Sequence, residues 1–275
     1  MRLATIRDGG ATRAVRVDDD SAVDLGVSDV GELLRSAGWR DEAASATGAS
    51  RPAGDLDFAP LIPRPEKIIC VGLNYRNHIL ETGRDVPEYP TLFAKYIPAL
   101  IGANDDVILP SVSNDCDWEA ELAVIIGKRV RHVSVENARD AIAGYSVVND
   151  VSIRDYQNRT LQWLQGKTFE SSTPIGPYLV TPDETPGPSR EILCEVDGEV
   201  KQKSDTADLV FDPFTLISYI SDIITLEPGD VIATGTPGGV GFARNPKEFL
   251  KDGSVMITRI AGVGELRNVC RRETA

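Results

Sequence analysis

Short apolar runs set the pattern of this chain. Five of them have strand length and turn-forming residues nearby, and they predict buried strands at 67–73, 122–126, 177–181, 192–196 and 231–234. Because these strands do not alternate with helices in a regular rhythm, we expect a mainly β, α+β domain rather than a doubly wound sheet.

Two segments have helical character. Asp212 and Pro213 form a helix start, and apolar residues then recur at helical spacing, at Phe214, Ile217, Ile220 and Ile224. The stretch NYRNHILETG, residues 74–83, predicts a short helix or a lid loop that ends at Gly83.

The N-terminal region has a different pattern. Two alternating runs on either side of Asp8-Gly9-Gly10 predict a hairpin. Ser28 or Asp29 then caps a short helix that has Leu33 and Leu34 on its inner face.

A linker follows this region in the sequence. Residues 41–65 are rich in Ala, Gly, Ser, Asp and Pro, which predicts a connection rather than packed elements. We therefore expect a small N-terminal unit and linker over residues 1–60, and a main domain over residues 61–275.

Three carboxylates interrupt the apolar pattern just before one predicted strand. In the segment DWEAELAVII, Asp117, Glu119 and Glu121 alternate, so on a strand they would share one face about 7 Å apart. At that distance each like-charge pair costs roughly 2 kcal/mol at an effective dielectric of about 20. One interpretation is a solvated edge strand; the other is a cation site, because Asp150 ends a neighbouring apolar run and would complete an all-oxygen ligand set.

Composition narrows the possible functions. The net charge of −13 argues against a general surface for nucleic acid or anionic membranes, and no apolar run approaches the length of a membrane-spanning helix. The N-terminal sequence lacks the apolar core of a secretory signal, and the four scattered cysteines suit reduced thiols, so we expect a cytoplasmic protein. With His78 and His132 as the only histidines, sites that need several imidazoles are excluded, and zinc is disfavoured.

A histidine and a glutamate stand three residues apart in HILE. If this piece is helical, His78 and Glu81 share a face, and the carboxylate would orient the imidazole and raise its basicity for water activation. Taken alone, the pair is more simply interpreted as a surface histidine beside a helix-face glutamate.

Cationic and polar side chains follow Asp150. Arg154 and Gln157 are spaced like neighbours on a helix, and Lys167 offers a compact charge for an oxyanion. The loop 233–242, ATGTPGGVGF, allows close backbone approach to an anion, although it matches neither a P-loop nor a dinucleotide-binding fingerprint. Unrelated surface residues and a plain tight loop remain the alternatives.

Taken together, six segments in one order resemble the fumarylacetoacetate hydrolase family, in its shorter form with a small N-terminal region. The resemblance covers residues 66–270. It rests on VGLNYRNHILETG, ALIGANDDVILP, DWEAELAVIIGK, GYSVVNDVSIRDYQ, QGKTFESSTPIGPYLVT and LEPGDVIATGTPGGVG. The resemblance implies a mixed β-sandwich roll with a small N-terminal α/β appendage, a homodimer, and one bound divalent cation, Mg²⁺ or Mn²⁺, with Ca²⁺ as a further option.

The same resemblance assigns roles to ten residues, position by position. Those roles are metal ligation by Glu119, Glu121 and Asp150; general-base catalysis by His78 with Glu81; oxyanion stabilisation by Lys167; and substrate binding by Arg154, Gln157, Gly235 and Thr236. Asp117 is not transferred as a ligand and is expected to be a bystander at the rim of the site.

The implied activity is carbon–carbon bond hydrolysis of an acylpyruvate-type 2-oxo acid. The cation would act as a Lewis acid, His78 would activate water, and Lys167 would stabilise the pyruvate enolate. The same site also suits decarboxylation of oxaloacetate or isomerisation of a 2-hydroxyhepta-2,4-diene-1,7-dioate, and the first shell of ligands does not choose among them. A non-catalytic metal-binding protein is disfavoured, because it would not need a base beside an electron sink.

Overall fold

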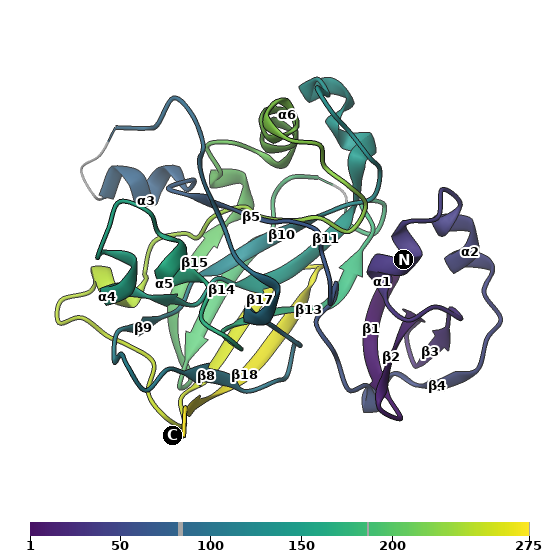
Figure 1. Ribbon diagram of the computed structural model, residues 1–275, viewed down its shortest axis with the longest axis horizontal. Helices are drawn as coiled ribbons and strands as arrows, with labels where there is room; N and C mark the ends of the chain where they lie inside the picture. The colour runs from purple at the N-terminus through teal and green to yellow at the C-terminus, as the bar shows by residue number, and fades with distance from the viewer. Residues whose placement is uncertain (82–84, 186, 275) are drawn as a thin grey trace.

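The N-terminal strands extend the main sheet of the protein. The computed structural model describes residues 1–81, 85–185 and 187–274, without the side chains of His78 and Glu81. Strand β1 (Arg2–Asp8) pairs with β2 (Ala11–Val17) in the predicted hairpin, and Gly9 and Gly10 adopt the positive φ that this tight turn needs. On its other edge β1 pairs antiparallel with β13 (Thr173–Val180) of the main domain, which joins the purple N-terminal part of Figure 1 to the central sheet.

The large sheet has eleven strands. In spatial order they are β4 (Ser50–Pro52), β3 (Ser21–Asp24), β2, β1, β13 (Thr173–Val180), β11 (Ile142–Asn149), β10 (Ala120–Ile126), β16 (Val231–Ala233), β5 (Ile68–Gly72) and β6 (Thr91–Ala94), with β7 (Leu100–Ile101) parallel to β13. The five strands predicted from apolar runs are β5, β10, β13, β14 and β16, each within a few residues of the expected bounds. The prediction of a mainly β, α+β fold is confirmed.

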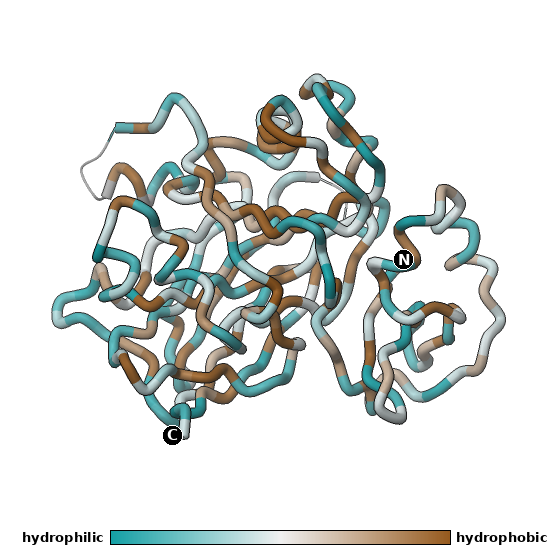
Figure 2. The backbone as a smooth tube through the Cα atoms, in the orientation of Figure 1, coloured by the Kyte–Doolittle hydropathy of each residue, from teal (hydrophilic) through white to brown (hydrophobic). Residues whose placement is uncertain are grey.

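A second sheet packs against the first. It contains β15 (Glu199–Asp205), β14 (Glu191–Val196), β17 (Val255–Ile260), β18 (Gly264–Arg272) and β8 (Val107–Leu109), while β9 (Cys116–Asp117) and β12 (Ser152–Ile153) form a separate short ladder. The main hydrophobic core contains Leu122 of β10 together with Ile192 and Met256 of the second sheet, all buried. In Figure 2 the apolar backbone segments gather at these central strands, as expected for a core enclosed between two layers.

The helices are short and lie around the sheets. They are α1 (Val30–Leu34), α2 (Trp39–Ser45), α3 (Arg76–Glu81), α4 (Arg154–Gln157), α5 (Leu164–Lys167) and α6 (Pro213–Ile223). Asp29 caps α1 and Asp212 caps α6, each by accepting a backbone N–H bond, as their sequences predict. Both Ile217 and Ile220 of α6 are buried, whereas Ile224, at its end, is 45% exposed.

The prediction of an unstructured connection over 41–65 was wrong in its first part. Helix α2 and strand β4 lie within this stretch, and Ala43 of α2 is fully buried. Small residues in this stretch pack against the hairpin, so a composition typical of loops here serves close packing. The rest of the stretch is a connection, and two of its own residues, Leu61 and Ile62, are buried.

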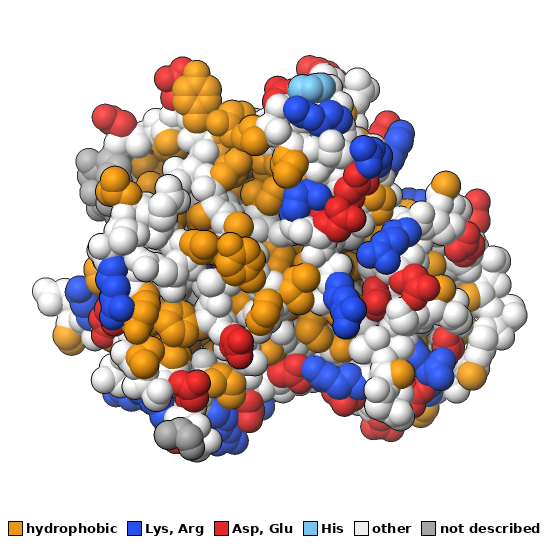
Figure 3. Space-filling view, in the orientation of Figure 1, with side chains coloured by type: hydrophobic (Ala, Val, Ile, Leu, Met, Phe, Trp, Pro, Cys, Tyr) orange, Lys and Arg blue, Asp and Glu red, His pale blue; other side chains and the backbone are white. Residues whose placement is uncertain are grey.

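The remaining expectations about the surface concern charge and thiols. Figure 3 shows acidic and basic side chains interspersed on the face in view, so the excess negative charge is not gathered there into one patch. All four cysteines are free and buried, and burial raises the pKa of Cys116 and of Cys270 to about 12. Within the described ranges, no helix has both the length and the apolar character needed to cross a bilayer.

A buried threonine fastens the N-terminal region to the main domain. Thr5 of β1 donates to the carbonyl of Leu61 (2.7 Å) and accepts from the amide of Val30 (3.0 Å). Thr5→Val keeps the shape but leaves both backbone groups unsatisfied, so we predict a loss of about 2 kcal/mol and of roughly 4–8 °C in melting temperature. Thr12→Val, on the partly exposed face of β2, should stay within about 0.5 kcal/mol, and equal losses in the two variants would contradict this role.

Candidate metal centre

Pairing between two strands creates the acidic centre. Strands β10 and β11 are antiparallel with Ala120 opposite Asn149, and the amide of Asp150 donates to the carbonyl of Glu119 at 2.9 Å. This register sets the end of β11 beside the start of β10. Two carboxylates that are about thirty residues apart in sequence therefore meet at one edge of the sheet.

The three predicted metal ligands lie together. One carboxylate oxygen each from Glu119, Glu121 and Asp150 falls within 4.8 Å of the others, and all three side chains are buried. The segment is not one continuous strand, because β9 ends at Asp117 and β10 begins at Ala120. Asp117 therefore belongs to a different strand from Glu121, and Glu119 lies between the two strands.

Two buried lysines form ion pairs with Glu119 and Asp150. Lys167, at the end of α5, donates to Glu119 Oε2 at 2.7 Å and to Asp150 Oδ2 at 2.8 Å. Lys95, just after β6, donates to Asp150 Oδ1 at 2.5 Å. Both ammonium groups are almost fully buried, and Lys167 also lies over the ring of Phe93 at 5.1 Å. Each oxygen of Asp150 therefore has its own cation.

An arginine connects the centre to the glycine-rich loop through Asp117. Arg154 lies 2.6 Å from Glu119 Oε1 through Nη1 and donates from Nε to Asp117 Oδ2 at 2.8 Å. Asp117 also accepts from the amides of Gly241 (2.7 Å) and Phe242 (2.9 Å). The expectation that Asp117 is a bystander at the rim was wrong: its side chain is fully buried and anchors both Arg154 and the loop, although it is not a member of the ligand cluster.

The charges of this group do not balance. Four buried carboxylates, Asp117, Glu119, Glu121 and Asp150, face three buried cations, Lys95, Arg154 and Lys167. Among the residues that the structure describes, no cation forms an ion pair with Glu121, whose Oε2 accepts from the amide of Gly235 at 2.8 Å. A buried carboxylate without a cation is costly, so Glu121 must take up either a proton or a metal ion.

The pKa shifts follow from these contacts. Burial, reinforced by Asp150 and Glu119, raises the pKa of Glu121 well above its usual range. Burial also opposes ionisation of Asp150, but Lys167 and Lys95 outweigh it and lower the pKa of that carboxyl. For Lys167, burial is outweighed by Asp150 and Glu119, so the pKa is raised and the ammonium keeps its proton. Without a metal, Glu121 is thus the member of the cluster that its surroundings most favour in the protonated form.

The glycine-rich loop approaches the centre through its backbone. Gly235 has φ +101°, and a Cβ there would lie 2.9 Å from both Asn74 Cβ and the carbonyl of Val71, so only glycine fits without strain. Thr236 is half-buried, and its Oγ1 accepts from Gln202 Nε2 at 2.8 Å. The threonine hydroxyl hydrogen therefore stays available for a further acceptor.

The structure brings together most of the residues expected from sequence. Gln157 lies beside Arg154, since its Oε1 accepts from Arg154 Nη1 at 2.9 Å. His78 and Glu81 fall within α3, but their side chains lie outside the described part of the structure. Asn74, just before this helix, donates to the carbonyl of Thr234 at 2.8 Å and so places the start of α3 next to the loop.

Sequence reasoning missed Lys95. The signal was a single lysine in the apolar stretch LFAKYIPAL, and a charge in such a setting is either at an exposed end of a strand or paired inside. Gln202 was missed as well; its Oε1 accepts from the amide of Ala120 at 2.9 Å and so supports the first residue of β10.

The donor set fits a divalent cation. Three carboxylates supply only oxygen atoms, which is the ligand type that Mg²⁺, Mn²⁺ and Ca²⁺ prefer. Each carboxylate has more lone pairs than its present hydrogen bonds use, so Glu119 and Asp150 can ligate a metal while they still accept from Lys167. The excess carboxylate at Glu121 gives such an ion its electrostatic complement.

Comparison with known proteins now adds independent support. The family model for the C-terminal region of fumarylacetoacetate hydrolase matches residues 67–271. A bovine protein named oxaloacetate tautomerase FAHD2A, mitochondrial, is 44% identical over 220 residues, which are 79% of this chain and 70% of that protein. The region that the family model matches contains every residue of the acidic centre.

Solved structures with similar folds have isomerase and hydrolase names. The 5-carboxymethyl-2-hydroxymuconate delta-isomerase of Mycobacterium smegmatis is 32% identical with a TM-score of 0.83, over 99% of this chain and 100% of that one. The maleylpyruvate hydrolase of a Sphingobium species, solved with manganese(II) and pyruvate, is 31% identical with a TM-score of 0.84 over 100% of both chains.

Replacing Glu121 should separate metal binding from stability. In Glu121→Gln a neutral amide replaces a buried carboxyl whose pKa is raised, so the free energy of unfolding of the metal-free protein should change by no more than about 1 kcal/mol. The wild type should gain about 2.7 kcal/mol at Mn²⁺ a hundred times above Kd, and Glu121→Gln should gain almost none. Thermal unfolding with and without Mn²⁺ measures both; Glu199→Gln, at an exposed site, serves as control.

Replacing Asp117 should lower the stability of the metal-free protein but leave metal binding intact. In Asp117→Asn the amide nitrogen that replaces Oδ2 can accept from neither Phe242 N–H nor Arg154 Nε, so the metal-free protein should lose about 3 kcal/mol or more. Because Asp117 is not a ligand, the gain on adding Mn²⁺ should persist. Asp115→Asn, a partly exposed neighbour, should be nearly neutral. Loss of the Mn²⁺ response in Asp117→Asn at unchanged stability would place this residue among the ligands.

Proposed function

The chain belongs to the fumarylacetoacetate hydrolase family, and we propose that it is a divalent-metal-dependent enzyme that enolises a short 2-oxo acid, with keto–enol tautomerisation of oxaloacetate as its reaction. The observation that carries this proposal is the buried Lys167 ammonium between Glu119 and Asp150. An enolate formed at this centre would find a charged hydrogen-bond donor, the Lys167 ammonium, held in place before the reaction begins.

The three carboxylates would hold the cation. Glu119, Glu121 and Asp150 are its ligands, and Mg²⁺ or Mn²⁺ fits their oxygen atoms best. When bound, the cation supplies Lewis acidity, which favours the enolate form of a 2-oxo acid. Manganese is present in the Sphingobium maleylpyruvate hydrolase, which supports Mn²⁺ as the first ion to test.

The residues around the centre divide the remaining work. Lys167 keeps its proton at neutral pH, so it acts as a hydrogen-bond donor to the enolate oxygen rather than as a base. Arg154 retains one buried nitrogen, Nη2, that has no acceptor in the described part of the chain. This nitrogen and the free hydroxyl hydrogen of Thr236 supply donors for a substrate carboxylate, and Gln157 holds Arg154 in place.

Tautomerisation also needs a group that moves the proton at C3 of the substrate. The motif assigns this task to His78, oriented by Glu81, on helix α3. The anchoring of Asn74 to the loop that carries Gly235 supports this assignment, because it sets the start of α3 beside the acidic centre. From keto to enol, His78 would take the proton from C3, and the enolate oxygen, which accepts a hydrogen bond from Lys167, would take up a proton from solvent. From enol to keto, the oxygen would return its proton to solvent and protonated His78 would give one to C3.

Carbon–carbon bond hydrolysis of an acylpyruvate is the second candidate. The His78–Glu81 pair favours it, because a histidine–carboxylate base can also activate water. The bovine tautomerase, at 44% identity, supports the first candidate, whereas the hydrolase and isomerase structures are 31% and 32% identical. Decarboxylation of oxaloacetate and isomerisation of an unsaturated hydroxydioate use the same enolate and belong in the same assay.

Assembly and location are further parts of the proposal. We propose a homodimer that works on a small 2-oxo acid and needs neither nucleic acid nor membrane. The reduced, buried cysteines support the cytoplasm as its compartment, although the bovine relative is named as mitochondrial.

A substrate panel with Mn²⁺ tests the proposal. We predict that the purified protein interconverts enol and keto oxaloacetate, and that kcat/KM for this reaction exceeds that for acetylpyruvate hydrolysis by about a hundredfold or more. Chelation should remove the activity, and added Mn²⁺ or Mg²⁺ should restore it. Lys167→Met should lower kcat by roughly 10²–10³, as expected for the loss of one oxyanion donor.

The controls make the outcome decisive. Lys203→Met, at an exposed site, should match the wild type. Full activity after chelation, or in Lys167→Met, would contradict the proposed chemistry. If kcat/KM for acetylpyruvate hydrolysis is higher than for oxaloacetate tautomerisation, and this hydrolysis is lost in His78→Ala, the protein is a hydrolase instead.

A further inference from the structure

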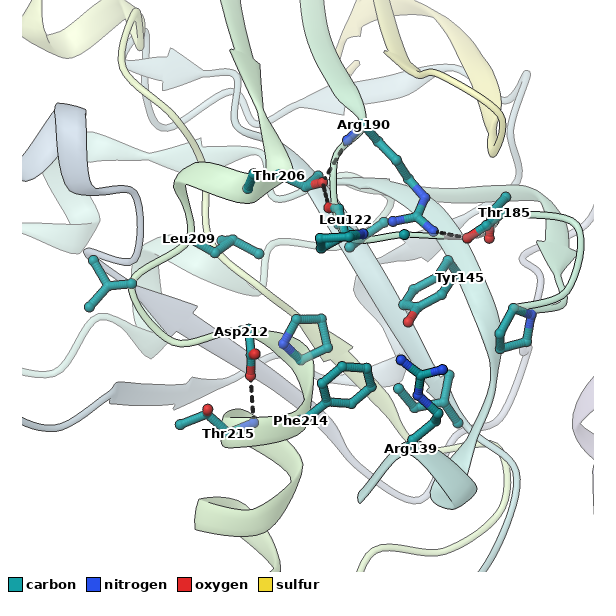
Figure 4. Close-up of a pocket in the computed structure, with 17 residues that line it drawn as sticks. Leu122, Arg139, Tyr145, Thr185, Arg190, Thr206, Leu209, Asp212, Phe214 and Thr215 are labelled. Atoms are coloured by element: carbon teal, nitrogen blue, oxygen red, sulfur yellow. Dashed lines mark hydrogen bonds between the residues drawn. The ribbon is translucent and has the colours of Figure 1, made fainter. Parts of the chain in front are cut away.

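A second cavity lies away from the acidic centre. It has a volume of about 610 Å³. Its walls include Thr185 and Arg190, residues between Thr206 and Thr215 at and before the start of α6, and Ile142 and Tyr145 of β11. Figure 4 shows Arg190 and Arg139 on opposite sides of Tyr145, with Phe214 of α6 nearby. Leu122 reaches this cavity from β10, on the face opposite to Glu121, so the strand separates the two sites.

Arg190 brings an unpaired positive charge to the wall of the cavity. Its side chain is only 7% exposed, it donates to the carbonyl of Thr185, and its guanidinium lies 4.8 Å from the centre of the Tyr145 ring. Its Nε has no hydrogen-bond acceptor, and no carboxylate pairs with it, anywhere in the ranges that the structure covers. Burial accordingly lowers the pKa of Arg190.

A second unsatisfied polar atom lines the same cavity. The hydroxyl of Thr185 is buried and has no partner among the described residues. Arg139, at the exposed side, adds another guanidinium 5.3 Å from the ring of Phe214. Unsatisfied buried groups are rare in folded proteins, and two of them on one wall indicate a missing hydrogen-bond acceptor.

The described residues that line the cavity supply no carboxylate partner for Arg190. Asp212 is the one carboxylate among them; its Oδ1 caps α6 by accepting from the amide of Thr215 at 2.8 Å, and it forms no ion pair with Arg190. The other walls are largely apolar, with Leu122, Ile142 and Leu209 among them. The lining thus combines two arginines and a hydroxyl with a hydrophobic surface, as is typical of pockets for small organic anions.

We propose that this cavity is a binding site for a small organic carboxylate that carries an aromatic or short aliphatic body. The carboxylate accepts from Arg190 Nε and the Thr185 hydroxyl, and Arg139 closes the exposed side. The body of the ligand lies against Leu122, Leu209 and Phe214. This site goes beyond the proposed enolisation and involves none of its residues.

Calorimetric titration of the full chain with benzoate tests the proposal, with benzamide as the neutral analogue and inorganic phosphate as an anion without an apolar body. Benzoate should bind at least about tenfold more tightly than either, because only benzoate satisfies both the charge and the apolar walls. The affinity should be the same with Mn²⁺ and after chelation, since the acidic centre takes no part.

Four variants locate the binding. Arg139→Gln and Thr185→Val should each weaken benzoate by roughly fivefold, and Arg190→Gln by about tenfold or more. Arg271→Gln, at an exposed arginine on β18, should leave the affinity unchanged. Arg139 is exposed, so its variant should fold even if Arg190→Gln does not.

Several results would overturn the proposal. They are equal binding of benzoate and benzamide, equal or tighter binding of phosphate, binding that requires Mn²⁺, or unchanged affinity in both Arg139→Gln and Thr185→Val. A change of molecular mass in Arg139→Gln, by light scattering and without any benzoate binding to the wild type, would assign the cavity to contact between copies of the chain instead.

Discussion

The buried carboxylate of Glu121 is the constraint on which the centre depends. Around it, Asp117, Glu119 and Asp150 each have a cationic partner, whereas Glu121 has the amide of Gly235. Burial of such a group is unfavourable unless a proton or a cation neutralises it. The fold therefore places one more carboxylate than cations where a divalent ion would be bound, and we propose that this carboxylate, once it has lost its proton, gives the site its affinity for the ion.

The surrounding structure holds this imbalance in place. Pairing of β10 with β11 sets Glu119 and Asp150 side by side, and Lys167 and Lys95 fix the orientation of Asp150. The positive charges of these lysines also offset the repulsion between the carboxylates of Glu119 and Asp150. Asp117 also ties Arg154 to the glycine-rich loop, so the proposed donors for a substrate and the proposed metal ligands belong to one hydrogen-bonded network.

Patterns in the sequence predicted what depends on local spacing. Alternation and caps predicted the hairpin, α6 and the main strands, and the motifs singled out the three carboxylates that the structure brings within 4.8 Å of one another. What depends on distant contacts could not be predicted in this way. The loop-like composition around Ala43 concealed a packed helix, because small residues suit both; and the role of Asp117 became visible only through Arg154 and Gly241, far away in sequence. Lys95 was missed because its partner, Asp150, belongs to a different part of the sheet.

Counting bound Mn²⁺ by electron paramagnetic resonance tests the central claim most directly. We expect one tightly held Mn²⁺ for each chain of the metal-stripped protein, and release of a proton as it binds, because the raised pKa of Glu121 favours a proton that a metal ion would displace. A folded protein that binds no Mn²⁺, or one that binds it equally well after Glu119, Glu121 and Asp150 are all replaced by their amides, would contradict the account.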